Sequence, residues 1–224
     1  DVAKDAKDRG SLPVFLGGDH SIAAGTIAGV ASHFKAKNEK LGLIWFDAHT
    51  DMNTPATSPS GNVHGMPLAS LLGYGSEALN AVGGDEPAID ASNVYVIGAR
   101  DVDENEKKMV VKSGINVFSM KEVDSLGMAE VSRLAIEGAS KGTAGIHLSF
   151  DIDGLDPMVA PGVGTPVRGG INFREAHLLM ELISDSQLLT SVDIVELNPV
   201  EDVRNQTADA VVHLMQSVFG RRIL

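Results

Sequence analysis

The chain has 224 residues, of which 43% are hydrophobic and 21% charged, with no cysteine and a formal net charge of -12 at pH 7. This apolar content is enough for one large core, and no run approaches the roughly 18 continuous apolar residues of a membrane span. The absence of cysteine excludes disulfides and thiolate metal sites and favours the cytoplasm. The acidic balance argues against a nucleic-acid partner.

Short apolar runs alternate with helical patterns along the chain. The runs that predict strands are residues 12–16, 41–46, 93–98, 115–118, 146–152 and 191–197. Apolar stripes at helical spacing predict three helices, with the stripes Ala23, Ile27, Val30 and Phe34; Ala176, Leu179, Met180 and Ile183; and Ala208, Val211, Val212, Met215 and Phe219. This alternation is typical of a parallel sheet covered on both faces. We therefore expect one α/β domain over residues 1–224.

Three of the predicted strands end at motifs that are rich in aspartate and histidine. The carboxyl ends of parallel strands meet at one edge of a sheet, so these side chains are expected to converge. Four carboxylates without compensation would repel one another and largely take up protons. Two divalent cations would cancel their charge, so the sequence predicts a two-metal site. The candidate ligands are His20, Asp47, His49, Asp51, Asp151 and Asp153.

This ligand set also indicates the class of metal. Carboxylates with a minority of imidazoles suit hard to borderline cations, which favours manganese, with cobalt, nickel or iron as possible substitutes. Two such ions can hold a shared water as hydroxide near neutral pH, ready to attack an electrophilic carbon. Taken alone, a histidine that follows a strand, such as His20, is usually just a polar loop residue. Asp156 precedes Pro157 and is interpreted as a turn residue.

Several motifs, in order along the chain, resemble the ureohydrolases and the arginases in particular. They are Gly-Gly-Asp-His-Ser at 17–21, Phe-Asp-Ala-His-Thr-Asp-Met-Asn-Thr at 46–54, Ser-Gly-Asn-Val-His-Gly-Met-Pro at 60–67, Ser-Phe-Asp-Ile-Asp-Gly-Leu-Asp-Pro at 149–157, Gly-Thr-Pro-Val at 164–167 and Asp-Ile-Val-Glu-Leu-Asn-Pro at 193–199. The resemblance implies a three-layer α/β/α fold of the arginase/deacetylase type with a mainly parallel sheet. It also implies a binuclear manganese centre and hydrolysis of L-arginine to L-ornithine and urea.

The resemblance further implies how the ligands are shared between the ions. Asp47 and Asp151 would bridge the two ions, and Asp51 would also hydrogen-bond the bridging hydroxide and carry its proton to the leaving amine. One manganese ion would be held by His20, Asp47, Asp51 and Asp151, and the other by Asp47, His49, Asp151 and Asp153.

Two further residues have catalytic roles in this interpretation. A guanidinium carbon is a poor electrophile, so catalysis needs a carboxylate that orients the planar group. Glu196 alternates with Val195 and Leu197 at a strand end and fits that role, the alternative being a solvated charge. His64 lies in the glycine-rich loop 61–65, where an imidazole close to the metals can relay protons to bulk water.

The resemblance also places the amino-acid end of the substrate. The Ser-x-Asn-x-His spacing at 60–64 is similar to that of arginases rather than agmatinases, whose substrate has no carboxylate. Each of these loop residues could alternatively serve ordinary turn chemistry. The implied substrate contacts are Asn53, Ser60 and Asn62 to the α-carboxylate, Asp103 and, through water, Glu106 to the α-ammonium, and Thr165 near the guanidinium.

Family members extend further at the N-terminus and include a first strand that this chain lacks. We expect that strand to be central, so that its absence leaves a gap between two unpaired edges and the chain needs the segment for a stable metal site. The alternatives to a manganese arginase are another guanidino hydrolase, such as an agmatinase, and a non-catalytic truncated subunit. The C-terminal segment 219–224 resembles bacterial arginases and implies a homo-oligomer, a hexamer or a trimer.

Overall fold

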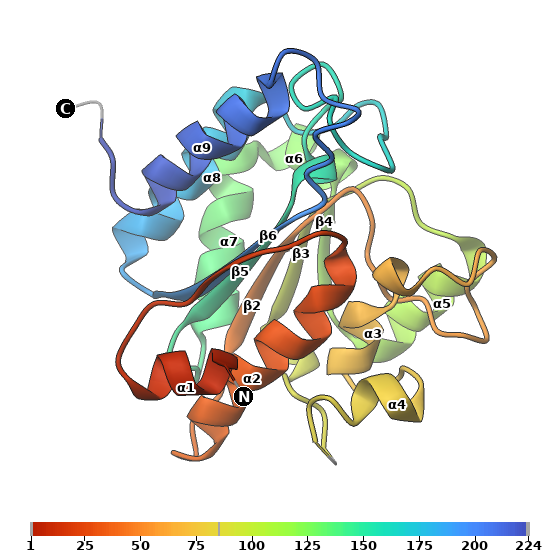
Figure 1. Ribbon diagram of the computed structural model, residues 1–224, viewed down its shortest axis with the longest axis vertical. Coiled ribbons are helices and arrows are strands. Elements are labelled where there is room, and N and C mark those ends of the chain that lie inside the picture. The colour runs from red at the N-terminus through yellow and green to blue at the C-terminus, as the bar shows by residue number, and fades with distance from the viewer. Residues whose placement is uncertain (1, 85, 223–224) are drawn as a thin grey trace.

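The computed structural model describes residues 2–84 and 86–222, in which a parallel six-stranded sheet lies between two layers of helices (Figure 1). The strand order is β1-β6-β5-β2-β3-β4. This confirms the predicted three-layer α/β architecture, and each of the six predicted runs contains most of one strand. The strands are β1 (Val14–Leu16), β2 (Gly42–Phe46), β3 (Val94–Ala99), β4 (Asn116–Ser119), β5 (Ile146–Asp151) and β6 (Leu189–Val195).

The helices divide between the two faces of the sheet (Figure 1). One face carries α1 (Val2–Asp8), α2 (Ala23–Lys35), α3 (Pro67–Leu71), α4 (Glu77–Asn80) and α5 (Glu104–Ser113). The other carries α6 (Met120–Leu126), α7 (Met128–Ser140), α8 (Phe173–Ser186) and α9 (Gln206–Val218). No helix among the described residues is long and apolar enough to cross a lipid bilayer.

Strand β2 shows why the sheet needs helices on both faces. All five of its residues are buried, and alternate side chains enter different cores. Leu43 and Trp45 pack in the core beneath α2 and α3, whereas Ile44 and Phe46 pack in the core beneath α7 and α8. This two-sided burial fixes the strand, and therefore the point at which Asp47 leaves it.

The helical stripes are confirmed in α2 and α8 and only in part in α9. In α9, Val211 and Met215 are buried as predicted, but Val212 is 54% exposed and Phe219, beyond the last helical residue, is 49% exposed. Leu214 and Val218 complete the buried stripe instead. Residues 211, 214, 215 and 218 lie on one helical face, and residue 212 is turned about 100° from residue 211.

The prediction of a gap in the middle of the sheet is wrong. Strands β6, β5, β2 and β3 each have a parallel partner on both sides. The sheet instead ends at β4 on one side and at β1 on the other, where Val14 pairs with Val192 of β6. The exposed apolar surface therefore lies on the outer strand β1, where Leu16 is 77% exposed, and not between two separated halves.

An exposed apolar edge strand is a site for edge-to-edge association. We predict that Leu16→Lys reduces concentration-dependent self-association of the 224-residue chain, measured by light scattering, because the ammonium opposes pairing along β1. The free energy of unfolding should change by less than about 0.5 kcal/mol. The matched control is Val111→Lys on α5, which is 83% exposed but lies on no sheet edge. Equal association of the Leu16 variant and the parent chain would contradict this.

Candidate metal and substrate site

The predicted metal ligands converge at the carboxyl ends of β2 and β5 and in the turn after β1. His20 Nδ1 lies 3.0 Å from both Asp47 Oδ2 and Asp151 Oδ2 and 3.2 Å from Asp51 Oδ2. His49 Nδ1 lies 3.3 Å from the other Asp47 oxygen, Oδ1, and 3.2 Å from Asp153 Oδ2. Asp47 therefore belongs to two clusters, each of which could hold a metal ion: one with His20 and Asp151, the other with His49 and Asp153.

The environment of His20 shows that its cluster fits a cation. His20 Nδ1 is buried and has no hydrogen-bond partner in the described part of the chain, although it faces three carboxylates. The other ring nitrogen, Nε2, is 2.8 Å from Ser149 Oγ and can donate to it. In that tautomer, Nδ1 presents its lone pair to the carboxylate oxygens. Such an arrangement of oxygen and imidazole donors is stable only around a proton or a metal ion.

The pKa values of the site residues also indicate that the site favours a bound cation. Burial raises the pKa of Asp51 to about 8, and the charge of Asp47 adds to this. The pKa of Asp151 is also raised by burial and by the neighbouring Asp153 and Asp47. Burial lowers the pKa of His49, but the Asp153 and Asp47 carboxylates outweigh it and raise the value to about 12. Without an ion the site therefore holds extra protons, which a bound dication would displace.

Two residues on the strands hold the first cluster in place. The Trp45 indole N–H donates to Asp47 Oδ2 at 2.9 Å, and its ring stacks on the His20 imidazole with centroids 4.0 Å apart. Ser149 Oγ is hydrogen-bonded to the other ring nitrogen of His20, Nε2. Neither Trp45 nor Ser149 is among the site residues predicted from the sequence. Each lies two residues before a predicted ligand on the same strand face, which is the signal that could have found them.

Two acidic residues of the site adopt the left-handed backbone conformation that favours glycine. Asp51 has φ 49° and Glu196 has φ 67°. Such conformations cost of order 1–3 kcal/mol and persist where surrounding contacts enforce them. Glu196 Oε1 accepts a hydrogen bond from the backbone N–H of His20 at 2.8 Å, which links the ends of β6 and β1. Burial raises the pKa of Glu196, and the His20 N–H opposes this effect.

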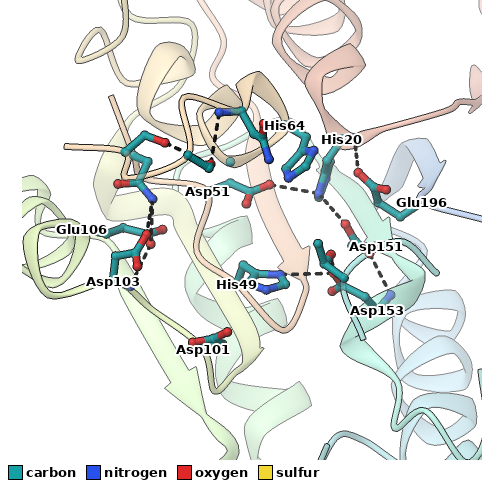
Figure 2. Close-up of a pocket in the computed structure, with 16 residues that line it drawn as sticks. His20, His49, Asp51, His64, Asp101, Asp103, Glu106, Asp151, Asp153 and Glu196 are labelled. Carbon is teal, nitrogen blue, oxygen red and sulfur yellow. Dashed lines mark hydrogen bonds and ion pairs between the residues drawn. The ribbon is translucent and has the colours of Figure 1, made fainter. Parts of the chain in front are cut away.

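A cavity of about 220 Å³ opens in front of the two clusters. All the predicted site residues line it except Asp47, which is fully buried. The metal-side residues Asp151, Asp153 and Glu196 lie across the pocket from Asp103 and Glu106 (Figure 2). Three further lining residues are not among those predicted from the sequence: Ser58, Gly65 and Asp101.

The wall of the cavity opposite the metal clusters is organised around Glu106. This buried carboxylate accepts hydrogen bonds from the Met52 N–H and from Asn53 Nδ2, both at 3.1 Å, and from the Thr50 hydroxyl. It also forms the capping box of α5 with Asp103, whose Oδ2 accepts from Asn53 Nδ2 at 3.1 Å. Burial raises the pKa of Glu106, and these donors oppose the effect. Glu106 thus ties the loop that carries Asn53 to the start of α5.

The remaining predicted residues lie on loops around the cavity. Ser60 and Asn62 are exposed, and the Asn62 N–H donates to Ser60 Oγ at 3.2 Å. His64 lies in the short helical turn η2 (Val63–Gly65). Thr165 Oγ1 donates to Asp153 Oδ2 at 2.9 Å, so it contacts the cluster of Asp47, His49 and Asp153.

Comparison with known proteins agrees with this geometry. Residues 1–220 match the model of the Arginase family. The chain belongs to this family. It is 55% identical over 223 residues to the arginase of Brevibacillus brevis, covering 100% of this chain and 74% of that protein. The structure superposes on arginase from Bacillus caldovelox with a TM-score of 0.96 at 52% identity, covering 100% of this chain and 73% of that one.

A more distant family member has been solved with a ligand. Entamoeba histolytica arginase, in complex with L-ornithine, superposes with a TM-score of 0.90 at 39% identity, covering 98% of this chain and 74% of that one.

We predict that Asp151→Asn removes most of the bound metal from at least one cluster and nearly all turnover. The amide keeps the size of the side chain but loses the charge that holds the ion. Metal content after dialysis gives the measurement. Asp124→Asn, an exposed aspartate on α6, should change nothing. Full metal occupancy with near-normal turnover in the Asp151 variant would refute the ligand assignment.

Proposed function

We propose that this chain hydrolyses L-arginine to L-ornithine and urea at a binuclear manganese centre. The observation that carries the proposal is the pair of His/Asp clusters that share Asp47 at the floor of a small acidic cavity. Relatives that are named arginases, at more than 50% identity over nearly the whole chain, support the same substrate. The chain spans 74% and 71% of the lengths of these two relatives.

In this proposal, His20, Asp47, Asp51 and Asp151 hold one ion and Asp47, His49, Asp151 and Asp153 hold the other. The two separate oxygens of Asp47, each facing a different histidine, support its bridging role. The donor set favours manganese, with cobalt, nickel or iron as substitutes. When bound, the ions supply charge compensation and make a water molecule acidic enough to act as a nucleophile near neutral pH.

The residues of the chain itself then orient the substrate and move the protons. Glu196 faces the cavity and pairs with the planar guanidinium, which it orients for attack. Asp51 accepts the proton of the nucleophile and delivers it to the leaving amine. His64, at the cavity edge, exchanges that proton with bulk water.

The far wall of the cavity suits an α-amino acid. Asp103 offers a carboxylate to the α-ammonium, and Glu106 acts on it through water. Asn53, whose Nδ2 donates to both carboxylates, lies beside them for the α-carboxylate. Ser60 and Asn62, both exposed at the cavity edge, supply donors for the α-carboxylate. Thr165 lies at the opposite end, where the guanidinium would be. A net charge of -12 suits a cationic substrate.

The alternatives differ in what they need from this site. An agmatinase acts on a substrate that has no carboxylate, so it gains nothing from Ser60 and Asn62. A non-catalytic truncated subunit needs no complete ligand set. We further propose that the protein acts in the cytoplasm as a homo-oligomer, a trimer or a hexamer, as the resemblance to bacterial arginases implies.

The direct test is urea release from arginine and from agmatine, with and without manganese. We predict manganese-dependent release from arginine and a much slower rate with agmatine, because the α-carboxylate contacts are lost. Faster release from agmatine would favour the other guanidino hydrolase. Stoichiometric metal with no release from either compound would favour the non-catalytic subunit.

We predict that His64→Asn lowers turnover by about 10²–10⁴-fold, the usual effect of losing a proton-transfer group. Metal content should stay at the parent level, because His64 belongs to neither metal cluster. His213→Asn, an exposed histidine on α9, is the control and should be silent. Loss of manganese from the His64 variant would mean that His64 is a ligand and not a relay.

A further inference from the structure

Arg100, at the end of β3, binds backbone carbonyls instead of a carboxylate. Its guanidinium makes six hydrogen bonds to five carbonyl oxygens, and no carboxylate lies within ion-pair distance of it among the described residues. Nη2 donates to Asp153 O at 2.7 Å, to Leu155 O at 3.1 Å and to Val167 O at 2.9 Å. Nη1 donates to Gly154 O at 3.0 Å and to Gly98 O at 3.2 Å.

Four of these carbonyls belong to two segments that line the cavity, and the fifth, Gly98 O, belongs to β3 itself. One segment is the turn after β5, which carries Asp153, and the other is the loop that carries Thr165. The two side chains meet in the hydrogen bond from Thr165 Oγ1 to Asp153 Oδ2. The Arg100 guanidinium therefore joins two segments that are distant from it in sequence, the turn by 53–55 residues and the loop by 67 residues. The side chains of these segments meet at the cluster of Asp47, His49 and Asp153.

The backbone of Arg100 also binds the segment that carries Asp47 and His49, the other two members of this cluster. The Arg100 N–H donates to Ala48 O at 2.8 Å, and the Ala48 N–H donates to Asp153 Oδ1 at 3.1 Å. Ala48 lies between Asp47 and His49, the other two members of the cluster. All three ligands are thus fixed, directly or through one neighbour, to Arg100, the residue that directly follows β3.

The loop around Arg100 has no spare room. A Cβ atom at Gly170 would lie 2.5 Å from Arg100 Nη2 and 2.7 Å from the backbone nitrogen of Asp156. The Asp156 carboxylate accepts the backbone N–H groups of Gly169 and Gly170 at 2.8 and 3.0 Å, which closes the loop over the guanidinium. A planar fork with five N–H donors suits this set of carbonyls, and a lysine ammonium does not.

We propose that Arg100 is a positioning residue that sets the metal affinity of the Asp47–His49–Asp153 cluster by holding the Asp153 turn and the Thr165 loop against the end of β3. The proposal rests on the metal centre proposed above, but not on arginine as the substrate. Loss of an outer contact of this kind typically weakens metal binding by about 10–100-fold. The His20 cluster, whose supports are Trp45 and Ser149, should be affected far less.

The test compares Arg100→Met, Arg100→Lys and the parent chain by titration with manganese alone and by hydrogen exchange of residues 152–171 without metal. Both variants should bind one ion about 10–100-fold more weakly, keep the affinity of the other within about threefold, and exchange these amides faster. Arg168→Met is the matched control, because Arg168 lies exposed in the same loop and makes no hydrogen bond or ion pair among the described residues.

Three results would overturn the proposal. Parent-like affinity for both ions together with parent-like amide exchange in Arg100→Met would show that the contacts position nothing. Full recovery of both properties in Arg100→Lys would assign the effect to charge alone. If both arginine variants fail to fold, Gly170→Ala tests the same contacts with Arg100 retained, and unchanged binding and exchange there would refute it. A parent chain that binds no manganese refutes the metal centre, and amide exchange then decides the positioning role separately.

Discussion

The arrangement of the site depends on one electrostatic constraint, the mutual repulsion of buried carboxylates. Asp47, Asp151 and Asp153 are almost completely buried, and Asp51 lies beside them. Burial and mutual repulsion raise the pKa of Asp51 and Asp151, so the metal-free site partly relieves the repulsion by holding protons. Histidines on both sides of Asp47 lower the pKa of that group, against the effect of its burial. A site built in this way is stable only with positive charge inside it, which protons supply in the metal-free chain and a metal ion could supply in their place.

Much of this could be predicted from the sequence because the information is local. A buried strand followed by alternating acidic and histidine residues specifies both the strand and the face on which Asp47 and Asp51 lie. What escaped prediction depends on contacts between distant segments. Strand β1 pairs with β6, some 180 residues away, and this long-range pairing removes the expected central gap. The exposure of Val212 and Phe219 likewise depends on where α9 turns and ends, which an apolar stripe alone does not specify.

The same reason explains which supporting residues were missed, and what the sequence did not show about Glu106. Glu106 was expected to act on the substrate through water, and that role stays a prediction. The structure adds that its carboxylate accepts from the Thr50 and Asn53 side chains and the Met52 N–H, more than fifty residues earlier in the chain. Ser149 and Trp45 look like ordinary strand residues in the sequence. Only the folded chain shows that both contact His20.

Strand β3 carries none of the proposed metal ligands, yet residues that follow it in the chain hold both walls of the cavity. Arg100, directly after the strand, is a cation that binds the carbonyls of the Asp153 turn. Glu106, in the first turn of α5, is an anion that binds the donors of the loop carrying Asn53. The wall with the two His/Asp clusters is thus held by Arg100, and the wall with Asp103 is held by Glu106. These two residues carry opposite charges and both lie between the end of β3 and the first turn of α5. In the proposed function, the spacing between these two walls would limit the length of the substrate, so the residues that hold the walls would contribute to substrate selection.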